Sequence, residues 1–294
     1  MKVLITGIDG FTGQHLEIFL LQKGFEVFGT VLEKNLKETY LACSIQNKKE
    51  VVSVIEKIQP EYIIHLAAIS FVGEKNASLI YDVNVIGTQN VLDALIELKI
   101  SPKKILLASS ATVYGNQNAQ VLDESMCPKP VNHYGISKLA MEHAAQSYFD
   151  KLDIIITRPF NYSGLGQAEH FLIPKIVKHF KEREKKIELG NLHVAREFNT
   201  IEYILEVYYE LMQSDIKSEI INLSSNKTIK LLEVIEMMNA LSGYKIEVHV
   251  NPDLVRKNEI ASLSGSCEKL YEKVPAVKSI DNDFSTMLKT MYVH

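Results

Sequence analysis

The chain has 294 residues, of which 46% are hydrophobic and 23% are charged, and its formal net charge is −4. This size and balance predict a globular protein with a full core, and the small acidic excess provides no basic field to attract nucleic acid. The three cysteines form no CxxC pair, the apolar N-terminus is too short for a signal peptide, and no apolar run has the length of a membrane span. We therefore expect a cytoplasmic protein that binds neither nucleic acid nor membrane.

Short apolar runs alternate with helical patterns through the first half of the chain. The strand candidates are rich in Ile, Leu and Val and cover residues 2–7, 25–31, 61–68, 103–110 and 152–159. The stretches between them, such as "TGQHLEIFLLQKG" and "YDVNVIGTQNVLDALIELK", have helical spacing. Apolar strands that alternate with helices predict an α/β fold with a doubly wound parallel sheet, the Rossmann architecture.

The pattern loosens after about residue 160. Helical spacing near 171–186, 201–213 and 230–242 alternates with short strand candidates near 187–190, 219–223 and 245–249. We therefore expect a dinucleotide-binding domain over 1–160 and a smaller C-terminal α/β lobe, mainly for substrate, over 161–294. Some segments of the second half are expected to return to the first domain.

The segment "ITGIDGFTGQHL" joins the first strand to the first helix and contains Gly7, Gly10 and Gly13 at a spacing of three. Glycines at these positions permit a tight turn, close approach of the backbone to a pyrophosphate, and close packing of helix on strand. The phosphates then meet the free N–H groups at the helix N-terminus. This loop predicts a bound NAD or NADP.

The residues that would separate NAD from NADP leave the choice open. The acidic residue that holds the adenine ribose of NAD is expected near the end of the second strand, but Val31 stands there. Glu33 could bind a ribose hydroxyl, and Lys34 could meet a 2′-phosphate. Both cofactors remain alternatives.

A hydroxyl, a phenol and an ammonium follow the fourth strand candidate. That strand ends at Ser110, and the next helical segment, "NHYGISKLAMEHAA", carries Tyr134 and Lys138 four residues apart. Positions i and i+4 share a helix face, and ligands of such sheets bind beyond the carboxyl ends of the strands, so the three side chains face one cleft. A neighbouring ammonium stabilises a phenolate, so we expect the pKa of Tyr134 to lie below its usual value near ~10.

Together these motifs resemble those of the extended short-chain dehydrogenase/reductase family, whose members act on nucleotide sugars. The matching stretches are "GIDGFTG" (7–13), "HLAA" (65–68), "NVIGTQN" (84–90), "SSATVYG" (109–115) and "YGISK" (134–138). The resemblance implies that Tyr134 is the catalytic acid/base, that Lys138 binds the nicotinamide ribose, and that Ser110 holds the reacting oxygen. It also implies a homodimer and a set of cofactor-binding residues, namely Gly7, Gly10, Phe11, Gly13, Leu66, Ala67, Ala68, Tyr134 and Lys138.

The resemblance also narrows the reaction. The 4,6-dehydratases of this family carry an acidic pair directly after the strand-end hydroxyl residue, where this chain has Ala111 and Thr112. Reduction or 4-epimerisation is therefore implied rather than dehydration. The segments "RPFNYSGLGQ" (158–167), "ELGNLHVAREF" (188–198) and "NPDLVRKNEIASLSG" (251–265) are most similar to the branch of GDP-4-keto-6-deoxy-mannose reductases and GDP-mannose 4,6-dehydratases. That branch implies substrate-binding roles for Asn161, Arg196 and Arg256, the arginines through the diphosphate.

We therefore expect NAD(P)H-dependent reduction of the 4-keto group of a GDP-4-keto-6-deoxy sugar. Ser44, Glu197 and Glu202 replace aspartates that are usual in the branch, which leaves the sugar open between a hexose of the GDP-rhamnose or talose type and a 6-deoxy-heptose. One alternative is a nucleotide-sugar 4-epimerase with tightly bound NAD, and another is a non-catalytic nucleotide-binding protein. The nine histidines form no ligand motif, so we expect no metal site.

Overall fold

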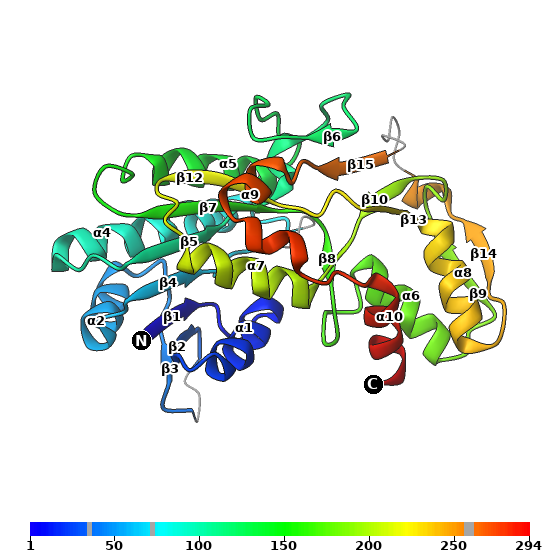
Figure 1. The fold of residues 1–294 in the computed structure, drawn as a ribbon, viewed down its shortest axis with the longest axis horizontal. Coiled ribbons are helices and arrows are strands. Elements are labelled where there is room, and N and C mark those ends of the chain that lie inside the picture. Colours follow the sequence, from blue (N-terminus) through cyan, green and yellow to red (C-terminus); the bar gives the residue numbers. More distant parts are fainter. Residues whose placement is uncertain (34–36, 71–73, 256–261) are drawn as a thin grey trace.

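The computed structural model of the chain describes residues 1–33, 37–70, 74–255 and 262–294. Its central feature is a parallel sheet of seven strands in the order β12-β7-β5-β4-β1-β2-β3 (Figure 1). The strands are β1 (Lys2–Thr6), β2 (Glu26–Val31), β3 (Tyr40–Ala42), β4 (Tyr62–His65), β5 (Lys104–Ala108), β7 (Ile154–Pro159) and β12 (Glu219–Leu223). The predicted doubly wound sheet is confirmed. Its strand order reverses between β1 and β4, the position at which open α/β sheets bind ligands.

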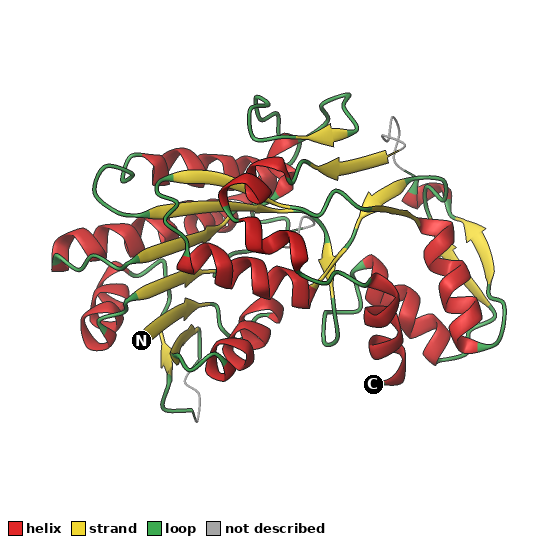
Figure 2. Cartoon of the chain, viewed as in Figure 1, coloured by secondary structure: helices red, strands yellow, loops and turns green. Residues whose placement is uncertain are grey.

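Helices cover both faces of this sheet because successive side chains of a strand point to opposite faces (Figure 2). In β1, Val3 and Ile5 pack in one core and Leu4 packs in the other. The first core lies against α1 (Phe11–Gln22), α7 (Ile201–Gln213), α9 (Glu268–Lys273) and the 3₁₀ helix η4 (Pro275–Ser279). The second lies against α2 (Lys48–Ile58), α4 (Thr88–Leu98) and α5 (His133–Gln146).

The stretch that leads into α4 contains a π-helix. The helical pattern over 81–99 begins within α3 (Ala77–Tyr81), continues through the π-helix η1 (Asp82–Gly87) and enters α4. Asn84 is buried in η1, where its side chain accepts the Ile69 N–H at 2.8 Å and donates to the Ile69 carbonyl at 3.1 Å. The π-helix therefore holds the segment that follows β4.

Segments from the second half of the chain return to the large sheet. The helix α7 packs on it, and β12 pairs with β7 in parallel, with Ile220 opposite Ile156. The remaining elements form a smaller lobe with its own core (Figure 1). They are α6 (Leu172–Lys181), β9 (Lys186–Leu189), α8 (Leu231–Ser242), β14 (Glu247–Val250), η3 (Pro252–Leu254) and α10 (Phe284–Val293).

Short strands connect the two parts. A four-stranded sheet has the order β13-β10-β15-β6, and a separate pair joins β11 to β8. Their bounds are β6 (Val121–Leu122), β8 (Tyr162–Ser163), β10 (Ala195–Glu197), β11 (Asn199–Thr200), β13 (Thr228–Lys230) and β15 (Ser262–Gly265). Glu197 is fully buried here, and its carboxylate accepts hydrogen bonds from Ser224, Ser225, Asn199 and Gly265. These four donors satisfy the charge and fix the connection.

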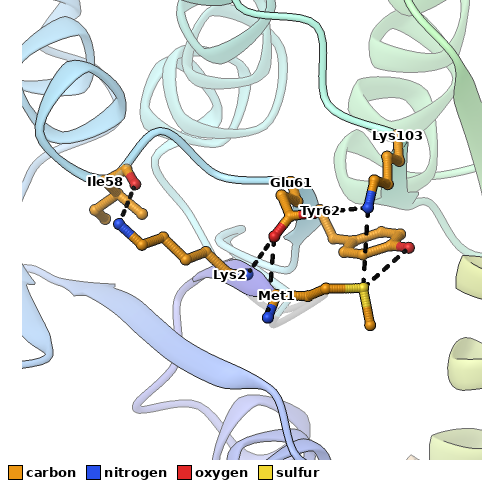
Figure 3. Close-up of polar contacts among 6 residues, drawn as sticks. All are labelled: Met1, Lys2, Ile58, Glu61, Tyr62 and Lys103. Atoms are coloured by element: carbon orange, nitrogen blue, oxygen red, sulfur yellow. Dashed lines mark hydrogen bonds and ion pairs between the residues drawn. The ribbon is translucent and has the colours of Figure 1, made fainter.

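Polar contacts join the amino ends of the central strands (Figure 3). These strand ends are opposite to the carboxyl ends, where the glycine loop lies. Glu61, directly before β4, accepts the Lys2 N–H at 3.2 Å and pairs with Lys103 at 2.7 Å. Lys103 directly precedes β5, so the contacts join the starts of three strands. Throughout the ranges that the structure covers, no helix has both the length and the apolar character needed to cross a membrane.

Candidate active site

The loop between β1 and α1 is shaped for the close approach of a ligand. Gly7 has a φ of +69°, and a Cβ atom there would lie 2.9 Å from the Ala67 Cα. A Cβ atom at Gly13 would lie 2.6 Å from the carbonyl oxygens of Gly7 and Ile8. Glycine is therefore required both for the turn and for the contact between α1 and the end of β1.

The N-terminus of α1 is suited to a pyrophosphate. Its N-cap, Gly10, has no side chain that could bond the free N–H groups, and the first turn contains no acidic residue. Phe11 stacks on Tyr162 with 6.1 Å between ring centroids, and the Tyr162 hydroxyl lies 2.8 Å from the Thr12 hydroxyl. The segment after β7 therefore packs against side chains of the first turn of α1. The free N–H groups at this helix end fit a dinucleotide phosphate.

The segment that follows β4 lies beside the glycine loop. The N–H of Leu66 donates to the Thr6 carbonyl at 3.2 Å, and the N–H of Ala67 donates to the Thr6 hydroxyl at 3.2 Å. Ala68 comes next and is half-buried. Because β1 and β4 are parallel neighbours, these residues and the glycine loop lie side by side at the carboxyl ends of the two strands.

A buried histidine supports this edge. The Thr88 hydroxyl donates to the Asn84 carbonyl at 2.9 Å, so it can only accept from Nε2 of His65, which lies 2.9 Å away. Nδ1 of His65 then accepts from the Thr6 hydroxyl at 2.8 Å. Burial lowers the pKa of His65 to about 3, so the ring is neutral and joins β1, β4 and α4. This histidine was not predicted as a functional residue; in the sequence it is only the first residue of the "HLAA" motif.

Ser110 and Tyr134 are brought together by the start of α5. Asn132 caps this helix by accepting the Gly135 N–H at 2.8 Å. A Cβ atom at Gly135 would lie 2.9 Å from the Thr112 carbonyl oxygen, so the first turn of α5 packs directly on the segment after β5. In this arrangement Ser110 is close enough to the Tyr134 phenol to lower its pKa, as a hydrogen-bond donor does.

The pKa of Tyr134 corrects one expectation. Burial raises it to about 12, and the hydrogen bond from Ser110 acts in the lowering direction. The sequence predicted a value below the usual one, through Lys138. Burial penalises the phenolate more than the hydrogen bond favours it, so the phenol stays protonated at neutral pH.

Lys138 lies one helical turn after Tyr134, as the spacing predicted. Its ammonium donates to the Ala108 carbonyl at 2.7 Å, at the last residue of β5, and the side chain is 4% exposed. Burial lowers the pKa of Lys138 to about 8, while the charge of Glu142 raises it. The lysine is therefore mostly charged at neutral pH.

The groups behind Lys138 were not predicted from the sequence. Glu142 continues the face of Tyr134 and Lys138 by one more turn, and its carboxylate accepts two hydrogen bonds from Arg158, at 2.9 and 2.6 Å. The Ser109 hydroxyl donates to the same carboxylate at 2.5 Å. The spacing of four residues was a signal for Glu142, whereas its contact with Arg158 of β7 depends on the fold.

The predicted substrate-binding residues lie toward the smaller lobe. Asn161 is exposed just after β7, and its amide donates to the Glu197 carbonyl at 3.1 Å. Arg196 is half-buried in β10, and its guanidinium donates to the Ala195 carbonyl at 2.7 Å. Arg256 lies outside the described residues. Substrate binding by these three residues stays a prediction.

Comparisons with known proteins agree with this geometry. The chain is 38% identical over 271 residues to a GDP-6-deoxy-D-talose 4-dehydrogenase from Aggregatibacter actinomycetemcomitans, covering 92% of this chain and 90% of that protein. It is 25% identical over 284 residues to a GDP-6-deoxy-D-mannose reductase from Pseudomonas aeruginosa, with coverage of 92% and 90%. The structure of RMD from Pseudomonas aeruginosa complexed with NADPH has the same fold, with a TM-score of 0.88, 23% identity and coverage of 99% and 97%.

The family resemblance is confirmed over most of the chain. The sequence model described as GDP-mannose 4,6 dehydratase matches residues 4–275, which include the glycine loop, the Ser110 and Tyr134 pair, and most of the smaller lobe. This match and the parallel sheet together show that the chain belongs to the GDP-mannose 4,6-dehydratase family of short-chain dehydrogenase/reductase proteins.

Proposed function

We propose that this chain is an oxidoreductase that uses NADH or NADPH to reduce the 4-keto group of a GDP-4-keto-6-deoxy sugar. Both relatives described above are named for oxidation or reduction of a GDP-linked 6-deoxy sugar. The observation that carries the proposal is the close packing of the first turn of α5, which carries Tyr134, on the segment that begins at Ser110, at the end of the sheet that also holds the glycine loop. These two parts lie on β5 and β1, two strand spacings apart, or roughly 10 Å.

The side chains divide the work of the reaction. The reduced nicotinamide supplies the hydride when it is bound. Tyr134 donates its proton to the oxygen at C4, which becomes the new hydroxyl. The resemblance implied that Ser110 holds that same oxygen; in this proposal its hydrogen is directed to the Tyr134 oxygen instead and stabilises the phenolate left behind. The Lys138 ammonium adds positive charge one helical turn away, and charge of this kind acts most strongly where water is excluded. The raised pKa of Tyr134 keeps the proton in place until the substrate accepts it.

The residues after Ser110 favour reduction over dehydration. Loss of water from a sugar requires a group that removes a proton from carbon and another that protonates the leaving hydroxyl. Ala111 has no such group, and the Thr112 hydroxyl donates to Ser110 at 2.9 Å. Neither residue is a base, so these two positions do not supply the groups that dehydration requires.

The nucleotide is bound by the smaller lobe in this proposal. Arg196 and Arg256 hold the diphosphate through their forked donors, and Asn161 lies at the entrance to the sugar site. We assign residues 1–160 and the returning α7 and β12 to the cofactor domain, and the rest of 161–294 mainly to substrate. A 6-deoxy-hexose and a 6-deoxy-heptose are both candidate sugars.

The cofactor preference depends on the end of β2. Val31 is buried and carries no carboxylate for a ribose, and Leu32 is 78% exposed beside it. A pocket without this carboxylate does not repel a 2′-phosphate, which favours NADPH, and Glu33 is the group that would favour NADH.

We also propose a cytoplasmic homodimer. Exposed apolar side chains lie on three neighbouring helices, with Ile86 on η1, Ile96 on α4 and Ile136 on α5, each at least 40% exposed. A second copy of the chain would cover them. The three cysteines are all free, as in proteins of a reducing compartment.

The direct test is turnover of a defined substrate. The protein is incubated with GDP-4-keto-6-deoxy-mannose and either NADPH or NADH, the loss of nicotinamide absorbance is followed, and the C4 configuration of the product is assigned by NMR. We expect stoichiometric oxidation of the cofactor. Tyr134→Phe is the matched control, and its rate should fall by about 10²- to 10⁴-fold with cofactor binding retained.

Two other outcomes would support the alternatives. Cofactor that stays bound through purification, with conversion between C4 epimers and no net oxidation, would indicate an epimerase. Nucleotide binding without conversion of any sugar would indicate a non-catalytic protein.

A further inference from the structure

Thr112 is held in place beside the proposed catalytic hydroxyl groups. It lies in the 3₁₀ helix η2 (Ala111–Tyr114), whose last two residues, Val113 and Tyr114, are fully buried. Its carbonyl oxygen is the atom that a Cβ at Gly135 would approach to 2.9 Å. Because α5 packs so closely on η2, Thr112 cannot shift without displacing the helix turn that carries Tyr134.

Thr112 occupies both acceptor positions of the Ser110 hydroxyl. The Ser110 Oγ accepts the Thr112 backbone N–H at 3.2 Å and the Thr112 side-chain hydroxyl at 2.9 Å. A serine hydroxyl has two acceptor lone pairs and one hydrogen. With both lone pairs used, the hydrogen of Ser110 is left to donate, and the turn of α5 that carries Tyr134 packs directly on η2. Ser110 also lowers the pKa of the Tyr134 phenol, as a donor to its oxygen does.

We propose that Thr112 is a positioning residue that sets the direction of a hydrogen-bond chain running from Thr112 to Ser110, from Ser110 to Tyr134, and from Tyr134 to the reacting oxygen of the substrate. The inference rests on the proposed function, since it concerns the same proton. When the Tyr134 oxygen accepts from Ser110, its own hydrogen is directed to the substrate, as reduction requires. Each donor also polarises the next one, so the terminal hydroxyl strengthens the whole chain.

The test compares Thr112→Val with Thr112→Ser. Valine has nearly the same shape and keeps the backbone N–H but removes the hydroxyl, whereas serine keeps the hydroxyl and removes the methyl group. For Thr112→Val we expect kcat to fall about fivefold to tenfold, the range for one neutral hydrogen bond, with KM within about twofold of the parent value. Thr112→Ser should retain the parental kcat.

A second measurement reports on the chain without turnover. In protein with isotope-labelled tyrosine, the ζ-carbon NMR signal of Tyr134, assigned with Tyr134→Phe, responds to hydrogen bonds at the phenol oxygen. We expect this signal to move in Thr112→Val and to keep its position in Thr112→Ser. Because the shift needs no substrate, it stays decisive even if the parent protein reduces none of the sugars tested.

The outcomes separate the inference from the proposed function. If the parent enzyme reduces the substrate and both variants have the parental kcat and the parental Tyr134 signal, the inference about Thr112 is overturned and the proposed function is not. An increase in KM with unchanged kcat in Thr112→Val would assign Thr112 to substrate binding and would also overturn it. If Thr112→Val fails to fold, loss of kcat with an altered Tyr134 signal in Thr112→Ser would contradict the inference, because serine keeps the donor.

Discussion

The carboxylate of Glu142 and the guanidinium of Arg158 form a buried two-point ion pair, with distances of 2.9 Å to Nε and 2.6 Å to Nη2. Their side chains are 1% and 3% exposed. The pair joins α5 to β7, and through Ser109 it also joins β5. The helix that carries Tyr134 and Lys138 is therefore anchored to the sheet directly beside the proposed site.

Loss of one partner of this pair should strongly destabilise the fold. Glu142→Gln keeps the shape of the side chain but leaves the Arg158 charge buried and unpaired, and we expect the free energy of unfolding to fall by about 3–5 kcal/mol. Urea denaturation measures it. The control is Glu61→Gln, which removes an exposed pair with Lys103 and should change stability little. A loss from Glu142→Gln as small as the control's would contradict the prediction.

The rate of reduction should fall at alkaline pH because of Lys138. Its pKa is lowered to about 8, so the ammonium is lost as the pH rises through that value, while Tyr134, with a pKa of about 12, remains protonated. We expect kcat/KM to decrease about tenfold per pH unit above about 8. In Lys138→Arg the arginine stays charged over this pH range. The variant is expected to be less active than the parent, but its activity should not decrease further as the pH rises. A descending limb at the same pH in both proteins would assign the limb to another group.

The glycine loop should tolerate a methyl group at one position better than at another. A Cβ at Gly13 meets two backbone oxygens at 2.6 Å, whereas a Cβ at Gly10 meets the Gly7 carbonyl oxygen at 3.3 Å. We expect Gly13→Ala to weaken NAD(P)H binding by about tenfold or more, since backbone atoms must move, and Gly10→Ala to weaken it less. Fluorescence titration of the reduced cofactor measures both. Equal affinities for the two variants would show that this close packing does not shape the cofactor site.

The stability contribution of His65 should depend on pH. Its pKa is lowered from 6.5 to about 3 in the folded chain, so below pH 6.5 the unfolded chain binds a proton that the folded chain does not. The contribution is fully present above that pH and decreases as the pH falls, by about 1.4 kcal/mol per unit. The stability difference between the parent and His65→Gln should therefore be about 1.4 kcal/mol smaller at pH ~5.5 than at pH ~7.5. A difference that is independent of pH would mean that His65 is not held neutral.

Much of the fold could be predicted because its signals are local. The strands β1, β2, β4, β5 and β7 are runs of apolar side chains, and a strand buried on both faces needs such a run. The glycine loop was recognisable because each glycine answers a steric requirement of a single turn. Tyr134 and Lys138 could be paired from their spacing, since an α-helix places such residues on one face.

The tertiary structure decided what depends on distant partners. β12 joins the large sheet beside β7, and the paired residues Ile156 and Ile220 are 64 positions apart in the sequence. The partner of Glu142, the neutral state of His65 and the direction of the hydrogen bonds at Ser110 follow from contacts, not from residue type. The pKa of Tyr134 rises although a lysine lies one turn away, because a pKa reflects the balance of burial and hydrogen bonding at one atom. A local sequence pattern identifies the groups that can react. Their charge states and their hydrogen-bond partners are determined only by the tertiary structure, because packing excludes water from around them.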